Sequence, residues 1–279
     1  MKDIIIKAED LYFSYDDAKS YSLCGLNLEI ERGRKVAFLG ANGAGKSTFF
    51  FCLNGIHRPL SGTLYIDGKP VDYSKKGLLE LRSKVGIVFQ DPDNQLFSAS
   101  VFQEISFGAL NIGMSPEEAE AAVRKVIDTL EITPFMDKPT HSLSGGQKKQ
   151  VSIADVLVMN PEIVILDEPA SSLDPKHTII VNRIVDMLAD QGMTVIMSTH
   201  DVDYALEWAD DIVLICEGKT LMHGSPTEVF SNEEALQKTN LKKPAAIELF
   251  ERLTEKGILP ADLPLPRSLQ ELEEYISQL

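Results

Sequence analysis

The sequence has few of the residues that mark several common classes of protein. It contains only three cysteines, Cys24, Cys52 and Cys216, whose wide separation gives neither a disulfide framework nor metal-ligand spacing. We therefore expect reduced thiols, as in a cytosolic protein. Basic residues are outnumbered, 27 against 42 acidic ones, and the formal net charge is −15. This charge argues against a broad nucleic-acid surface, which normally needs a basic patch.

Long hydrophobic runs are also missing. No stretch approaches the roughly 18 uninterrupted apolar residues of a membrane-spanning helix. The apolar run within Met1–Lys7 is too short for a signal peptide. Any association with a membrane is therefore predicted to go through a partner. The 279 residues, 44% of them hydrophobic, suffice for one large domain or for one domain with an appendage.

The distribution of apolar residues predicts an α/β protein with a mostly parallel sheet. Short apolar runs alternate with helical segments, as in strand–helix–strand units. The buried strands expected from these runs are Val36–Leu39, Val85–Phe89, Ile163–Leu166, Thr194–Met197 and Ile212–Ile215. An antiparallel β subdomain is expected at the N-terminus, from strands Ile4–Tyr15 and Leu26–Ile30 and a hairpin with strand Thr63–Ile66 and turn Asp67-Gly68.

Helical spacing of apolar residues defines two further parts of the chain. A helical subdomain, inserted at about residues 91–160, is predicted from helices Pro116–Leu130 and Gly146–Met159. A large domain over residues 1–230 is expected to be followed by a C-terminal helical extension over 231–279, with helices Pro244–Lys256 and Ser268–Ser277. The extension has an apolar stripe that packs on its own domain or contacts another subunit: Leu269, Leu272, Ile276 and Leu279.

A phosphate loop is the strongest motif in the chain. Residues Gly40–Ser47 match G-x-x-x-x-G-K-[ST] between an expected strand and the expected helix Ser47–Asn54. Its glycines let backbone N–H groups turn toward phosphates, and the helix N-terminus adds positive partial charge. We expect Lys46 to neutralise the β- and γ-phosphates and Ser47 to offer its hydroxyl to Mg²⁺. The other loop residues expected at the nucleotide are Asn42, Gly43, Gly45 and Thr48.

Two adjacent acidic residues end a buried strand. Asp167 and Glu168 follow Ile163–Leu166, and unpaired carboxylates at such a position are costly without a function. We expect Asp167 to reach Mg²⁺, directly or through water, and Glu168 to polarise the attacking water as a general base.

Three single residues complete the predicted nucleotide site. His200 follows the strand Thr194–Met197, at the strand end where α/β sheets bind ligands, and is expected to contact the γ-phosphate. Gln90 follows the strand Val85–Phe89 and is expected to bind Mg²⁺ or to orient water, although a simple helix cap would explain it equally well. Tyr15 is expected to stack on adenine, with Tyr12 and Phe13 as competitors for that role.

A second glycine-bearing turn has no evident ligand within one chain. It is Leu143-Ser144-Gly145-Gly146-Gln147, at the start of the predicted helix Gly146–Met159. It makes sense if it faces the phosphate held by another copy of the protein. The two motifs together suggest an ATPase whose site closes only when two subunits meet.

With these residues the chain strongly resembles the ATP-binding-cassette (ABC) ATPase family, from about Ile4 to Phe230. The signature Leu143–Gln147 before Asp167-Glu168 is the most specific part, and Ser171-Ser172-Leu173-Asp174 resembles the D-loop of the family. The resemblance implies a P-loop NTPase core of ABC type, with ATP and Mg²⁺ as cofactors and two subunits packed head to tail. It also implies that Ser144, Gly145, Gly146 and Gln147 bind the ATP of the partner subunit.

A finer resemblance is to the cobalt/nickel branch of energy-coupling factor (ECF) importers. It is carried by Phe89–Phe97, by Ser106-Phe107-Gly108 and by the length of the C-terminal extension. It implies a transmembrane coupling subunit, a substrate-binding membrane subunit and a peripheral location on the cytoplasmic face of the cell membrane. Leu96 and Phe97 are candidates for the groove that receives coupling helices, although core packing would explain them equally well.

Other functions remain as alternatives at this stage. Lys148-Lys149-Gln150 departs from the arginine that the family often has in the third place, and Pro169–Ser172 also differs slightly. Both departures leave room for an unequal partner, so the dimer is either a homodimer or a heterodimer. The competing functions are an importer of a vitamin or another substrate, a soluble ABC ATPase without a transporter, and a nucleotide-gated scaffold.

Overall fold

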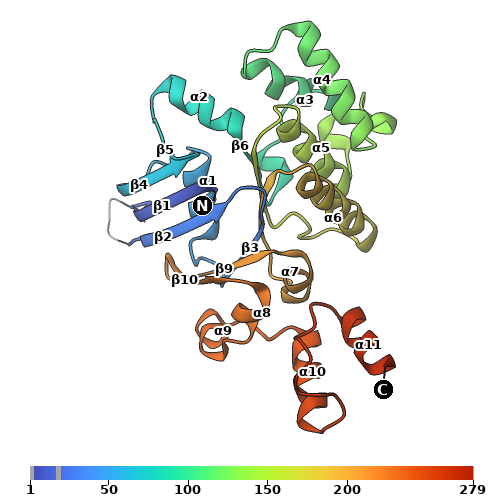
Figure 1. Ribbon diagram of the computed structural model, residues 1–279. Helices are drawn as coiled ribbons and strands as arrows, with labels where there is room; N and C mark the ends of the chain where they lie inside the picture. Colours follow the sequence, from blue (N-terminus) through green and yellow to red (C-terminus); the bar gives the residue numbers. More distant parts are fainter. Residues whose placement is uncertain (1–2, 17–19, 279) are drawn as a thin grey trace.

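The computed structural model describes residues 3–16 and 20–278 and contains two β-sheets (Figure 1). The first is antiparallel, in the order β2 (Leu23–Glu31), β1 (Ile4–Phe13), β4 (Ser61–Ile66) and β5 (Lys69–Pro70). The second runs β10 (Lys219–Gly224), β9 (Asp211–Cys216), β3 (Lys35–Leu39), β8 (Thr194–Ser198), β7 (Ile163–Asp167) and β6 (Val85–Val88). Its strands are parallel except for the β9–β10 pair. The α/β fold with a mostly parallel sheet and an N-terminal antiparallel sheet is thus confirmed.

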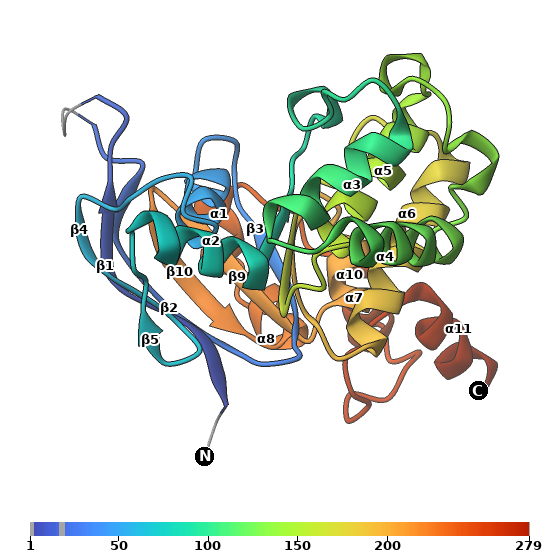
Figure 2. The ribbon, with the colours of Figure 1, turned by 90° about the horizontal axis from the view of Figure 1, so that it is seen from above.

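The helices fall into four groups along the chain. The first group is α1 (Lys46–Leu53) and α2 (Lys75–Lys84), and the second, in the helical subdomain, is α3 (Val101–Asn111), α4 (Pro116–Thr129) and α5 (Gly145–Leu157). The core helices α6 (Pro175–Asp190) and α7 (Val202–Trp208) follow, and the C-terminal group is α8 (Pro226–Phe230), α9 (Glu233–Thr239), α10 (Ala245–Glu255) and α11 (Leu269–Ser277). Figures 1 and 2 place the antiparallel sheet and α3–α5 at opposite ends of the molecule.

The six-stranded sheet is buried on both faces, and β3 shows how. Its side chains alternate, as successive residues of a strand do. Val36 and Phe38 pack toward the antiparallel sheet and α1, whereas Ala37 and Leu39 pack toward the helical subdomain. All four are fully buried, which explains the continuous apolar runs of the sequence.

Several expected boundaries were wrong by one or two residues. The first strand ends at Phe13 rather than Tyr15, and the strand before Gln90 ends at Val88 rather than Phe89. Phe89 leaves the sheet because its N–H and C=O are bound by the side chains of Gln95 and Lys149. The described helix α5 begins one residue early, at Gly145, and ends at Leu157.

The hairpin predicted around Asp67-Gly68 is present as β4 and β5, whereas other elements were not predicted at all: α2, α3, α7, α8, α9 and β10. Helix α2 buries only Leu81 among its ten residues, so it has almost no apolar periodicity. The strand β10 is only partly buried along its length, and α7 to α9 are each at most seven residues long. Tertiary packing, more than their own sequence pattern, holds these short segments.

The C-terminal extension has a small core of its own. Phe250, Leu259 and Leu272 are buried together between α10 and α11. Of the predicted apolar stripe, Leu272 is in this core, Leu269 and Ile276 are exposed, and Leu279 lies outside the described residues. The guanidinium of Arg267 donates to the carbonyls of Leu206, Glu207 and Ala209 at the end of α7, which ties the C-terminal helices to the preceding part of the chain. Over the described ranges, no helix is both long enough and apolar enough to span a bilayer.

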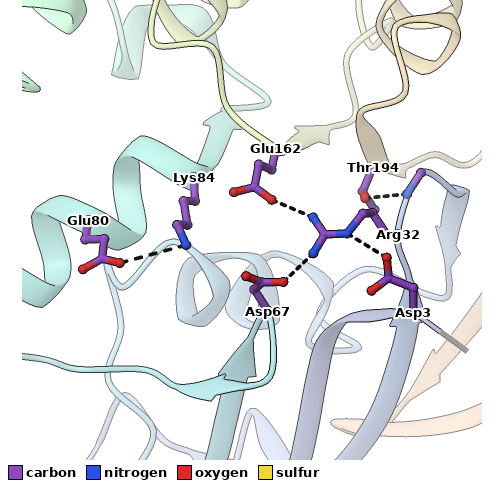
Figure 3. Close-up of polar contacts among 8 residues, drawn as sticks. Asp3, Arg32, Asp67, Glu80, Lys84, Glu162 and Thr194 are labelled. Carbon is purple, nitrogen blue, oxygen red and sulfur yellow. Dashed lines mark hydrogen bonds and ion pairs between the residues drawn. The ribbon is translucent and has the colours of Figure 1, made fainter. Parts of the chain in front are cut away.

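An arginine joins the antiparallel sheet to the six-stranded sheet (Figure 3). Arg32 follows β2 and pairs with Asp3 at 3.0 Å, with Glu162 at 2.6 Å and with Asp67. Asp67 lies in the turn between β4 and β5, and Glu162 directly precedes β7. The neighbouring Gly33 N–H donates to the Thr194 hydroxyl at the start of β8. This network fixes the orientation of the two sheets relative to each other.

We predict that Arg32→Ala lowers the free energy of unfolding by about 1–2 kcal/mol, because three carboxylates lose a shared cation. Urea denaturation measures the change. The control is Arg252→Ala, which removes a single exposed i,i+4 pair with Glu248 and should cost less than about 0.5 kcal/mol. Equal losses in the two variants would contradict a linking role for Arg32.

Candidate active site

A cavity of about 460 Å³ lies at the edge of the six-stranded sheet where its parallel strands end. It is lined by residues that follow β3, β6, β7 and β8, together with Tyr15 and Ser22 from the antiparallel part. Most of the residues expected at the nucleotide are here. The lining consists of Tyr15, Ser22, Asn42, Gly43, Gly45, Lys46, Ser47, Thr48, Gln90, Glu168 and His200.

The phosphate loop joins β3 to α1 in the conformation that its glycines permit. Gly40, Gly43 and Gly45 all have positive φ, at 146°, 78° and 111°. A Cβ on Gly40 would come within 2.3 Å of the Ile215 carbonyl oxygen, so only glycine fits there. Gly45 caps α1 without any side-chain hydrogen bond, which leaves the first N–H groups of the helix to an anionic ligand.

Lys46 is buried at the base of this loop. Its ammonium donates to the Gly40 and Ala41 carbonyls at 2.7 and 3.1 Å, and it is 6% exposed. Burial lowers the pKa of Lys46, against the opposing effect of Glu168 and Asp167. The cation therefore holds the loop in a closed shape next to the cavity.

Glu168 is the centre of the polar contacts around the cavity. Its carboxylate accepts from the Gln90 amide nitrogen at 2.8 Å and faces His200 Nε2 at 2.9 Å. Side chains that follow three neighbouring strands, β6, β7 and β8, are thus in contact through the Glu168 carboxylate. The backbone of Glu168 is left-handed, with φ of 44°, a conformation that costs about 1–3 kcal/mol for a residue other than glycine. Such strain at a site is typical of a functional position.

A buried serine, which the sequence analysis did not single out, holds this conformation. Ser198, at the end of β8, accepts from the Glu168 N–H at 2.8 Å and donates to Asp167 Oδ1 at 2.5 Å. Asp167 itself is buried and does not line the cavity. The only sequence signal for Ser198 was its position two residues before His200.

Oxygen atoms suited to a hard divalent cation are present at the cavity. Ser47 and Gln90 line it with a hydroxyl and an amide oxygen, the ligand types that Mg²⁺ prefers. The Asp167 carboxylate does not line the cavity and accepts from the Ser198 hydroxyl. The oxygen donors that line the cavity fit a divalent cation such as Mg²⁺.

Tyr15 is the aromatic residue of the cavity. Its ring is 63% exposed, and its hydroxyl lies 3.2 Å from the Thr48 hydroxyl at the phosphate loop. Phe13 and His57 contact the ring edge-on and fix its position. Phe13 is buried and Tyr12 packs on Tyr21, and neither lines the cavity.

No residue of the signature lines the cavity that the phosphate loop of the same chain borders. Ser144 and Gln147 form a reciprocal capping box at the start of α5, with hydrogen bonds of 3.1 and 3.3 Å. Gly145 is exposed with no atom near its missing Cβ, whereas a Cβ on Gly146 would collide with the His177 ring at 2.0 Å. Gly145 instead borders a separate hollow of about 250 Å³ beside Gln90, Lys149 and Ser171.

A strand–loop–helix that cradles phosphate, next to a paired Asp-Glu at the end of a parallel strand, defines a P-loop nucleoside triphosphatase. The sequence profile of the ABC transporter family matches residues 23–171. This chain belongs to that family. It is an ATP-binding and ATP-hydrolysing enzyme of the ABC type.

Comparison with individual proteins shows which members of the ABC family this chain is similar to. The energy-coupling factor transporter ATP-binding protein EcfA3 of Clostridium perfringens is 47% identical over 257 residues, which cover 92% of this chain and 90% of the relative. The solved structure of CbiO1 from Clostridium perfringens, part of the CbiONQ transporter complex, is 44% identical with a TM-score of 0.73, covering 91% of this chain and all of that one. The dimeric cassette MJ0796 with bound ADP and phosphate is 27% identical with a TM-score of 0.72, covering 80% and 99%.

We predict that Glu168→Gln retains ATP binding but lowers kcat for hydrolysis by about 10²–10⁴-fold, because the amide cannot accept a proton. A phosphate-release assay together with a nucleotide-binding titration separates the two effects. Glu117→Gln, on the exposed side of α4, is the matched control and should leave both values unchanged. Full turnover by Glu168→Gln would remove Glu168 from the role of general base.

Proposed function

We propose that this chain is the ATPase of an ECF-type importer and that two cassettes close on two ATP molecules to drive its membrane subunits. The observation that carries the proposal is the division of the site. The phosphate loop, Glu168 and His200 border one cavity, the exposed Gly145 of the signature borders a second hollow, and Gln90 borders both. A second cassette would bring its signature to the first cavity. The similarity to a dimeric cassette with ADP and phosphate supports that pairing.

The residues of the cavity would divide the chemistry among them. Lys46 and the N-terminus of α1 would bind the phosphates, and Tyr15 would stack on adenine. Glu168 would accept a proton from the attacking water, while Gln90 and His200 hold its carboxylate in place. His200 would also contact the γ-phosphate. Catalysis of this kind consists mainly of positioning and stabilisation of charge.

Ser47 and Gln90 would hold Mg²⁺, and Asp167 would act on it through water. The ion, when bound, neutralises charge that develops on the phosphate oxygens. From the partner subunit, Ser144, Gly145, Gly146 and Gln147 would close over the nucleotide. The capping box already binds the N–H groups of Ser144 and Gln147, so the N–H groups of Gly145 and Gly146 would be the ones left for the nucleotide at this helix N-terminus.

An exposed apolar patch on the helical subdomain supports contact with a membrane subunit. Phe97 is 67% exposed and meets Phe107 edge-on at 4.9 Å, and Leu110 on α3 is also exposed. Leu96, in contrast, packs against the core of the subdomain. Phe97 and its neighbours would receive a coupling helix, which would place the chain at the cytoplasmic face of the membrane through its partners.

Cobalt, or nickel, is the proposed cargo. The support is the similarity over nine tenths of the chain to CbiO1, which is part of a CbiONQ complex. Selection of the ion would belong to the membrane subunits. Leu269 and Ile276 of the C-terminal extension are exposed. The same proposal includes a contact between these side chains and another subunit.

We predict that Gly145→Asp abolishes ATP-dependent pairing of cassettes without affecting the fold, because Gly145 is exposed with open space around its Cβ. The added carboxylate would repel the γ-phosphate of the partner site. Size-exclusion chromatography with ATP and Mg²⁺, in a Glu168→Gln background that prevents hydrolysis, measures the dimer. Ala121→Asp places the same charge on the exposed side of α4 and should pair normally. Pairing by Gly145→Asp would count against the two-subunit site.

The transport function is tested by purification from native membranes in mild detergent, with partners identified by mass spectrometry. We expect one polytopic coupling subunit and a small substrate-binding membrane protein. The identity of the latter, followed by uptake of radioactive cobalt or nickel, distinguishes a metal importer from a vitamin importer. Recovery of ribosomes, DNA or only soluble partners would refute the transport role and leave the ATPase chemistry intact.

A further inference from the structure

Lys149 is a buried lysine that the chemistry described above does not use. It lies in the second turn of α5, is 1% exposed and is among the largest fully buried side chains. Its ammonium donates to the carbonyl oxygens of Phe89 at 2.8 Å and Gln90 at 2.7 Å. Within the described ranges it makes no ion pair. The cost of burial outweighs the effect of Asp167, Asp91 and Glu168, which favour its charged form, so the presence of this cation calls for a reason other than stability.

The two carbonyls belong to Phe89 and to Gln90 itself. Their positions set the position of the Gln90 Cα, from which its side chain extends. Phe89 and Gln90 directly follow β6 and are no longer paired with a strand. A second side chain reinforces the contact: Gln95 accepts from the Phe89 N–H at 3.3 Å and donates to the Ser152 carbonyl of α5 at 2.8 Å. The backbone of Phe89 is therefore bound on both sides by groups attached to one helix.

That helix is the one that begins with the signature. Gly145, Lys149 and Gln90 border the same hollow, so the first turn of α5 and the start of Gln90 are neighbours. On the other side of this contact, Gln90 donates to Glu168 at 2.8 Å. A continuous series of contacts thus runs from the signature through Lys149 and Gln90 to the general base.

We propose that Lys149 is a positioning residue that couples the signature helix, and thus the partner's nucleotide, to the catalytic carboxylate of its own chain. The proposal rests on the two-cassette function proposed above. When α5 moves against the partner's ATP, Lys149 carries the Phe89–Gln90 backbone with it. The Gln90 amide then forms or loses its hydrogen bond to Glu168. Hydrolysis at one site therefore depends on whether nucleotide is bound at the other.

Lys149→Met tests this, because methionine keeps most of the apolar stem and removes the donors. We expect kcat for ATP hydrolysis to fall about tenfold to a hundredfold, as for small misplacement of a catalytic group, with KM for ATP changed less than about threefold. Cooperativity between the two sites should fall as well, with a Hill coefficient near one. Lys149→Arg retains donors and should restore part of the loss. The control is Lys148→Met, since this neighbour on α5 pairs with Asp93 and does not contact the two carbonyls.

A double-mutant cycle with Gln90→Ala separates positioning from a structural role. If Lys149 acts through Gln90, then Lys149→Met causes no further loss of kcat in the Gln90→Ala background. Fully additive losses, an unchanged kcat in Lys149→Met, or a joint loss of ATP binding and thermal stability would each overturn the proposal. If instead the proposed two-cassette function is wrong, the same assays give a different result: Gly145→Asp leaves hydrolysis unaffected.

Discussion

The parallel pairing of β3, β8, β7 and β6 is the constraint on which the site depends. Parallel strands end at the same edge of a sheet, and ligands of such sheets bind at that edge. The phosphate loop, Gln90, Glu168 and His200 are far apart in the sequence but each follows one of these strands. Burial of the sheet on both faces fixes the register of the strands and, with it, the positions of these side chains.

The same edge carries several features that cost stability. Lys46 and Lys149 are cations buried against backbone carbonyls, and burial lowers the pKa of Lys149 to about 8. Glu168 has a left-handed backbone, held by the hydroxyl of Ser198. Each costly group is bound by at least one hydrogen bond, so the surrounding core is able to keep it in place. Packing alone would not favour buried cations and a strained backbone at one edge of a sheet. A nucleotide site requires such groups close together.

The signature shows how neighbouring glycines serve different purposes. Gly146 has no room for a side chain because the ring of His177 lies against it, so its identity follows from packing within the chain. Gly145 has open space around it and needs no glycine for the fold of a single chain. A close contact at this exposed position would have to come from outside the chain. The proposed second cassette supplies such a contact.

Much of the site could be read from local sequence. The phosphate loop, the Asp167-Glu168 pair and the signature are contiguous motifs. The strands before the first two, and the helices after the phosphate loop and the signature, were predictable from apolar runs. The buried strands were predicted within one or two residues. The weakly periodic α2 and the short α7, α8 and α9 were not, because neighbouring elements rather than their own sequences stabilise them.

The sequence by itself determined the α/β class and the chemistry of phosphate binding, because both depend on residues adjacent in the chain or repeated at short spacing. Only the tertiary structure decided which side chains meet. It brought Gln90 and His200 to one carboxylate, put Ser198 behind Asp167, and separated Tyr15 from Tyr12 and Phe13 at the cavity. It also attached Lys149 to the carbonyls of Phe89 and Gln90. These contacts join residues 31 to 78 positions apart, and strand pairing and helix packing alone set their distances.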